Sequence, residues 1–151
     1  MNRGEKQDRV EPSSASGGFT QSEDKLRTII NTIPVIAWCT QADGFGQFWN
    51  QRWHDYTRVP LEAARGWGWR SLIHPEDLDR VEKKWRADIE SGQAGEVEGR
   101  LRRFDGEYRW FLFRYEPMLD PQGNVVNWYG TNTDIDDLKR AQEALIDYCI
   151  I

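Results

Sequence analysis

Residues 98–110 read EGRLRRFDGEYRW, and this stretch carries the clearest fold signal in the chain. Two β-type runs here flank Asp105-Gly106, a dipeptide typical of the tight turn in a β-hairpin. Further along, the DPQG sequence at 120–123 marks a second turn between apolar runs. The pattern therefore predicts three consecutive antiparallel strands, at 94–104, 107–119 and 124–133.

A helix is predicted immediately before these strands. It begins at the HPED sequence of residues 74–77, where proline suits the first helical position and the acids suit the positive helix N-terminus. Its apolar residues recur at helical spacing up to a glycine that suits a C-terminal stop. These residues are Leu78, Val81, Trp85, Ile89 and the terminating Gly92.

A β-hairpin is predicted nearer the N-terminus, from VIAWCT at 35–40 and FGQFW at 45–49. Residues 1–22 are expected to form a flexible tail, 23–33 an amphipathic flanking helix, 34–135 the domain core and 136–151 a C-terminal linker helix. Two strands, a helical excursion and three strands together predict an α+β fold. We expect one five-stranded antiparallel sheet with helices covering one face.

Composition excludes several function classes. The 151 residues suit one domain, and 25 acidic against 20 basic side chains give a net charge of -5, which argues against nucleic-acid binding. No apolar run is long enough to span a bilayer, so no direct membrane contact is expected. Two distant cysteines suit a cytoplasmic location, although the parent protein could be membrane-anchored. The unusual number is eight tryptophans.

Several short motifs in order give the chain a family resemblance. HPED at 74–77, the 98–110 stretch, WYGT at 128–131 and Asp134-Ile135 resemble the successive signatures of a PAS domain with its C-terminal PAC segment. The resemblance covers residues 26–145. It implies a PAS fold with a pocket between sheet and helices, and a sensor or dimerisation module without catalysis. It also implies an output domain absent from this chain, in a sensor histidine kinase or cyclic-dinucleotide enzyme, with the kinase favoured.

Asp134 and Ile135 resemble the family's Asp-Ile-Thr signal-transfer motif, with Asp136 departing from it at the third position. We hypothesise that Asp134 pairs with Arg109 or Arg114 and so ties the last helix to the sheet. The alternative is that Asp134 only caps that helix.

Six tryptophans lie on elements that the fold would arrange around its central cavity. They are candidates to line a pocket for an unknown apolar or aromatic ligand, although large rings also commonly fill such a space. These candidates are Trp38, Trp49, Trp53, Trp69, Trp110 and Trp128.

No cofactor or metal site is predicted. Flavin-binding relatives use a reactive cysteine just before the long helix, whereas Cys39 and Cys149 lie elsewhere. Haem-binding relatives use a histidine on the long helix, which has none. The two histidines, His54 and His74, are expected to be structural, and with the cysteines they form no metal-ligand pattern.

The run at 107–119 is apolar on both faces, since Phe111, Phe113 and Tyr115 alternate with Trp110 and Leu112. One face should meet the helices, and the other needs a separate cover. The 26–33 helix and a second subunit are the two candidates, and the latter predicts a homodimer through flanking helices and the outer sheet face.

Two further functions stay open at this stage. The first is a ligand-free structural dimerisation module. The second is a small α+β enzyme with an aromatic pocket that uses His54 and Asp55 as acid and base. Adjacent helical residues point about 100° apart, which disfavours that pair.

Overall fold

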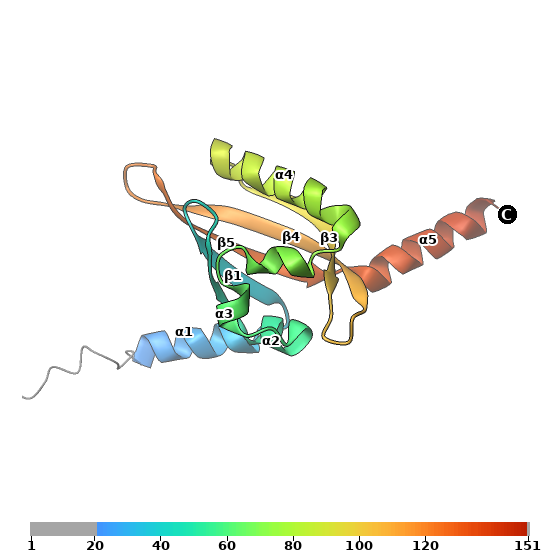
Figure 1. The fold of residues 1–151 in the computed structure, drawn as a ribbon, viewed down its shortest axis with the longest axis horizontal. Coiled ribbons are helices and arrows are strands. Elements are labelled where there is room, and N and C mark those ends of the chain that lie inside the picture. Colours follow the sequence, from blue (N-terminus) through green and yellow to red (C-terminus); the bar gives the residue numbers. More distant parts are fainter. Residues whose placement is uncertain (1–20, 151) are drawn as a thin grey trace, which may run out of the picture.

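The computed structural model describes residues 21–150 and contains one five-stranded antiparallel sheet (Figure 1). The strand order across the sheet is β2-β1-β5-β4-β3. The first strand in the chain, β1, therefore lies beside the last one, β5, near the middle of the sheet. The strands are β1 (Ile36–Gln41), β2 (Gly46–Trp49), β3 (Gly95–Arg102), β4 (Tyr108–Leu119) and β5 (Val125–Asp134).

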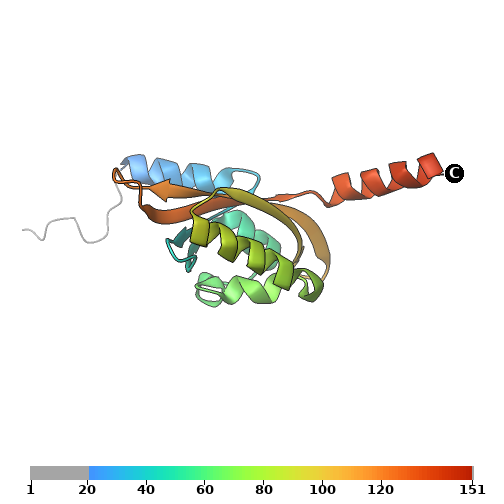
Figure 2. The same cartoon turned by 90° about the horizontal axis from the view of Figure 1, so that it is seen from above.

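Most helices cover one face of this sheet, whereas α5 runs away from the domain (Figures 1 and 2). The helices are α1 (Gln21–Thr32), α2 (Gln51–Thr57), α3 (Leu61–Ala64), the 3₁₀ helix η2 (Gly68–Leu72), α4 (Pro75–Ser91) and α5 (Asp136–Ile150). The α+β fold expected from the sequence is confirmed, including the sheet and its helical cover.

Local sequence signals explain where the main elements begin and end. Pro75 opens α4, and Gly92 ends it in the left-handed conformation, with φ of 70°. The turns after β3 and β4 contain Gly106 and Gly123, whose φ values of 88° and 85° favour glycine. These signals place the strands within one or two residues of the predicted bounds.

Asn50 has a different role from the helix cap that its position suggests. Its side chain makes no cap hydrogen bond to α2. Instead its Oδ1 accepts from the Ala37 N–H at 2.9 Å, and its Nδ2 donates to the carbonyls of Ile30 and Val35 at 2.8 and 2.9 Å. Completely buried Asn50 therefore joins the end of α1 to β1 and α2.

The N-terminal region departs from two expectations. Residues 1–20 of the proposed tail lie outside the described residues, and the last two, Gln21 and Ser22, belong to α1. The proposal that this helix covers the outer sheet face is wrong for the single chain. No residue of α1 is buried, and Leu26, Ile29 and Ile30 remain exposed.

The core lies between the sheet and α4, in two adjoining clusters of buried side chains. The larger one contains Trp53, Leu101 and Phe111. The smaller one contains Trp85 of α4 with Tyr115 and Trp128, whose rings meet edge to face. Along β4 and β5, buried side chains alternate with more exposed ones. One set therefore contributes to the core, and the other set lies on the outer face of the sheet.

Candidate functional site

An aromatic cavity of about 70 Å³ lies between the inner face of the sheet and the helices. Most of its wall is aromatic or aliphatic, and no charged side chain lines it. The lining residues are Trp38, Thr40, Trp49, Trp53, Trp69, Ile73, Val81, Trp85, Val97, Leu101, Phe113, Tyr115 and Asn132.

Four of the six candidate tryptophans line this cavity. Trp38 and Trp49 come from the paired strands β1 and β2, Trp53 from α2 and Trp69 from η2. Trp128 does not line it, because its fully buried ring packs behind the cavity against Trp85.

Trp110 lies on the other side of the sheet, so its assignment to the pocket is wrong. Successive residues along β4 point to opposite faces of the sheet, and Phe111 takes the inward position with 3% exposure. The Trp110 ring instead contacts two cations, with Arg100 at 5.0 Å and Lys139 at 4.4 Å from its centroid. It therefore belongs to the contact surface of α5.

The sequence interpretation missed several residues of the cavity wall. Phe113 and Tyr115 follow from the alternation of β4 once Phe111 is known to face inward. Trp85 was assigned only to the apolar stripe of its helix, and its ring also meets Trp38 edge to face, with centroids 5.5 Å apart. Asn132 had no motif to identify it.

A polar pair at the cavity wall joins β4 to α4. The Tyr115 hydroxyl donates a hydrogen bond of 2.5 Å to Asp88 of α4, and Lys84 lies 2.9 Å from the same carboxylate. Burial raises the pKa of Tyr115 above its usual value, and the hydrogen bond to Asp88 raises it further. The tyrosine is therefore held as a neutral donor that ties β4 to α4.

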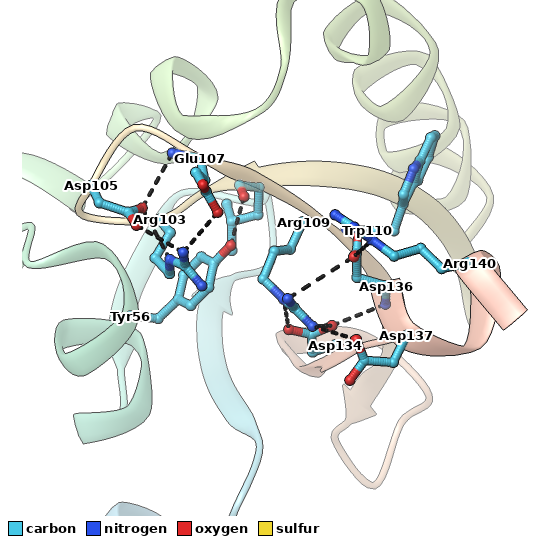
Figure 3. A network of polar contacts seen from close by, with 11 residues as sticks. Tyr56, Arg103, Asp105, Glu107, Arg109, Trp110, Asp134, Asp136, Asp137 and Arg140 are labelled. Carbon is cyan, nitrogen blue, oxygen red and sulfur yellow. Dashed lines mark hydrogen bonds and ion pairs between the residues drawn. The ribbon is translucent and has the colours of Figure 1, made fainter.

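A second candidate site lies at the junction between β5 and α5 (Figure 3). Arg109 Nε lies 2.6 Å from Asp134 Oδ2, while Asp134 Oδ1 accepts from the Asp136 N–H at 2.9 Å. The predicted ion pair with Arg109 is thus present, and Asp134 also caps the helix. Arg114, the other candidate, pairs with Glu96 at 3.3 Å.

Asp136 is the buried anchor of this junction, with 3% exposure. Its carboxylate accepts from the Trp110 backbone N–H at 3.1 Å and from Arg140 Nε at 2.6 Å. Burial acts to raise the pKa of Asp136, but these hydrogen bonds outweigh it, and the pKa is lowered. The residue that departs from the family motif therefore fastens α5 to β4.

The first turn of α5 also contacts the outer sheet face. Ile135 donates its backbone N–H to the Trp110 carbonyl at 2.8 Å and accepts from the Lys139 N–H at 2.9 Å. The Lys139 ammonium lies 2.6 Å from Glu98 as well as over the Trp110 ring. Beyond this turn, the helix has no buried residue.

The two histidines are occupied by local backbone contacts. His54 Nδ1 lies 2.9 Å from the Val59 carbonyl, and His74 Nδ1 accepts from the Glu76 N–H at 3.1 Å. Asp55 accepts from Gln51, so His54 and Asp55 do not form the suggested acid–base pair. Within residues 21–150, no group of three His, Cys, Asp or Glu side chains could hold a metal.

Comparison with known proteins shows the family. The sequence pattern of the PAS fold matches residues 47–132. The chain is 31% identical to the uncharacterized protein y4lL of Sinorhizobium fredii over 91% of its own length and 17% of that protein's. It is 41% identical to the peroxide stress-activated histidine kinase mak1 of Schizosaccharomyces pombe, over 85% of this chain and 8% of the kinase.

Solved structures share the fold. An RNA-binding Light-Oxygen-Voltage receptor superposes with a TM-score of 0.75 at 18% identity, covering 95% of this chain and 41% of that one. At this identity the likeness concerns the fold alone.

The chain belongs to the PAS-fold family, whose members are typically non-catalytic sensor modules. It spans less than a fifth of the length of the relatives named above, which have room for further domains. Among the described residues, no helix is long and apolar enough to cross a membrane.

Proposed function

We propose that this chain is a sensory and dimerisation module of a signal-transduction protein. A change in the occupancy or packing of the cavity passes through Asp134 and Ile135 into α5, and from there to an output domain outside this chain. Relatives that are histidine kinases, together with a probable diguanylate cyclase of Escherichia coli, support such an output, and we favour a histidine kinase. A cytoplasmic location suits this role.

The observation that carries the proposal is the double use of β4. Its inward side chains Phe113 and Tyr115 form part of the cavity wall, while Arg109 and Trp110 on the same strand hold the start of α5. A shift of β4 caused at the cavity therefore reaches the helix without any intermediate element. Coupling between two sites has a physical basis when both sites shift the equilibrium of the same structural element.

Exposed apolar residues support a homodimer. They lie on α1, on α5 and on the outer sheet face, where exposed surface of this kind commonly marks an interface. They include Leu26, Ile29, Phe48, Tyr129, Leu138, Leu145, Ile146 and Tyr148. We propose that a second copy covers these three surfaces together.

The cavity suits a small ligand better than a large cofactor. Light-Oxygen-Voltage proteins are among the structural neighbours, so a flavin is the group to test. Sites for drug-sized ligands measure about 300–1,000 Å³, whereas this cavity measures about 70 Å³, and neither cysteine nor histidine lines it. The residues present do not fit a three-ring flavin, and we propose no chemistry through one.

Hydrogen exchange of α5 tests the proposed route. Arg109→Gln removes the ion pair with Asp134, and we expect about tenfold faster exchange of the amides at 137–141, because the first turn loses a partly buried tie. Arg114→Gln is the matched control, since Arg114 lies on the same strand but pairs with Glu96. Equal exchange in the two variants would contradict the proposal.

A ligand-free structural module is the second candidate, and the small size of the cavity favours it. In that case the protein would dimerise, while no small molecule would alter its cavity or α5.

A further inference from the structure

The Tyr115–Asp88 pair lies at one end of a connected group of aromatic rings. The Tyr115 ring meets the Trp85 ring with centroids 4.6 Å apart. Trp85 in turn contacts Trp38 at 5.5 Å and the fully buried Trp128 at 5.4 Å. Indole and phenol rings can each give up one electron, so these residues form a continuous set of oxidisable side chains in the core.

One further ring connects this group to the surface. Trp67 is 41% exposed. A Cβ atom at Gly44 would lie 3.3 Å from Cη2 of Trp67 and 3.3 Å from Nε1 of Trp85, so the two indoles approach each other across this glycine. Gly44 also has a φ of 91°, which favours glycine. Neighbouring rings therefore lead from Tyr115 through Trp85 to the solvent.

Tyr115 has a proton acceptor that its neighbours lack. An oxidised phenol is a strong acid, and it loses its proton readily to a base within hydrogen-bond reach. The Tyr115 hydroxyl lies 2.5 Å from the carboxylate of Asp88. The indole N–H groups of Trp38 and Trp128 instead donate to amide oxygens, which are very weak bases. Oxidation with loss of a proton is therefore favoured at Tyr115.

The charge balance favours the same residue. An unpaired charge in an apolar core is unfavourable, which disfavours a radical cation on Trp85 or Trp128. Oxidation of Tyr115 with proton transfer leaves a neutral tyrosyl radical and a neutral Asp88. The remaining positive charge is that of Lys84, which lies 2.9 Å from Asp88 and has a side chain 45% exposed. Solvent therefore stabilises the charge that oxidation creates.

We propose that Tyr115 and Asp88 form a one-electron redox site that reduces a high-potential radical oxidant, such as an organic peroxyl radical, through Trp85 and Trp67. Tyr115 loses one electron and passes its hydroxyl proton to Asp88, which then donates a hydrogen bond back to the phenoxyl oxygen. The peroxyl radical gains the electron and takes a proton from water, and so becomes a hydroperoxide. This activity goes beyond the proposed sensory function and does not depend on it.

Flash photolysis of the whole protein tests the redox site. The probe is the tris-bipyridine complex of ruthenium(III), generated by light with a sacrificial electron acceptor, because it removes an electron and takes no proton. We expect a neutral tyrosyl radical in the wild type, identified by the change in its EPR spectrum when the tyrosine rings are deuterated. In heavy water the radical should form more slowly, because the proton moves with the electron.

Four variants locate the radical and its route. Tyr115→Phe keeps the ring and should abolish the tyrosyl signal that outlasts those of exposed tyrosines. Asp88→Asn removes the proton acceptor and should slow formation of that signal about tenfold or more. Trp67→Phe should lower its yield, because the surface end of the route is lost. Tyr56→Phe is the matched control, since Tyr56 donates to the Leu101 carbonyl and should leave the signal unchanged.

Several outcomes would overturn the proposal. One is a wild type that forms only tryptophan radicals or no radical, or that reacts equally fast in heavy water. Another is a long-lived tyrosyl signal of wild-type size in Tyr115→Phe, which would place the radical elsewhere, for example on Tyr129 beside Glu116. Unchanged kinetics in Asp88→Asn or an unchanged yield in Trp67→Phe would also contradict it. The wild-type measurements need no variant and stand even if a variant does not fold.

Discussion

Helices α4 and α5 begin in the same way and end differently. Each has a buried aspartate in its first turn that accepts a backbone N–H from a neighbouring strand. Asp77 accepts from Arg100 of β3 at 2.9 Å, and Asp136 accepts from Trp110 of β4 at 3.1 Å. Each aspartate also contacts arginine side chains, so both helices are fastened at their positive ends.

The two helices differ along the rest of their length. The apolar side of α4 is buried in the core through Val81 and Trp85. The apolar side of α5 is exposed to solvent: Leu145 is 63% exposed and Tyr148 is 78% exposed. An amphipathic helix gains most of its stability from packing its apolar face. The difference shows that α4 packs into the domain core, and it agrees with our proposal that α5 meets a second copy of the chain.

The largest expected effect comes from the packed side of α4. Trp85→Ala removes a ring that contacts Trp38, Tyr115 and Trp128, and it leaves a cavity behind. We expect a loss of about 3–5 kcal/mol in the free energy of unfolding. Urea denaturation measures it, and a loss below about 1 kcal/mol would show that α4 contributes little to the core.

The next effect concerns the anchor of α4. Hydrogen bonds from the Arg100 side chain hold the pKa of Asp77 below its usual range. Asp77→Asn removes this buried charge pair, and we expect a loss of about 3 kcal/mol, at the low end for breaking a buried pair because Arg100 is partly exposed.

The same lowered pKa gives the anchor a pH dependence. A carboxyl with a lowered folded-state pKa stabilises the fold above its unfolded pKa of about 3.9, and that stability is lost as pH falls through the folded value. Between about pH 5 and about pH 2, the unfolding free energy of the wild type should therefore fall by more than that of Asp77→Asn. Parallel losses in the two proteins would argue against this anchor.

The sequence predicts the ends and the packed face of helix α4 better than it predicts the residues of the cavity wall. Pro75 and Gly92 mark the helix ends, and the spacing of Val81 and Trp85 marks its packed face, because these signals are local. Alternation along β4 shows that Trp110 and Phe111 face opposite ways, but it does not reveal which face meets the helices. That choice depends on the sheet order, and it explains the wrong assignment of Trp110.

Polar contacts between distant segments were harder to foresee. Asn132 and Trp38 are 94 residues apart in the chain, and nothing around either residue indicates the other. The Asp134–Arg109 pair was predictable because a family motif singled out Asp134, although the motif did not show whether Arg109 or Arg114 would reach it. The antiparallel register decides this, since it places Asp134 opposite Phe111, near Arg109.

The smallest effect on unfolding should come from the bare side of α5. Leu145→Ser changes a side chain that is 63% exposed in the single chain, so at concentrations where the protein is monomeric the unfolding free energy should change by less than about 0.5 kcal/mol. At higher concentration the same variant should weaken the proposed homodimer, which light scattering would report as a lower mean mass. Glu143→Ser, two residues away and on another side of the helix, is the matched control and should leave the mass unchanged. A wild type that stays monomeric at tens of micromolar would contradict the dimer, and the apolar side of α5 would then require a different partner.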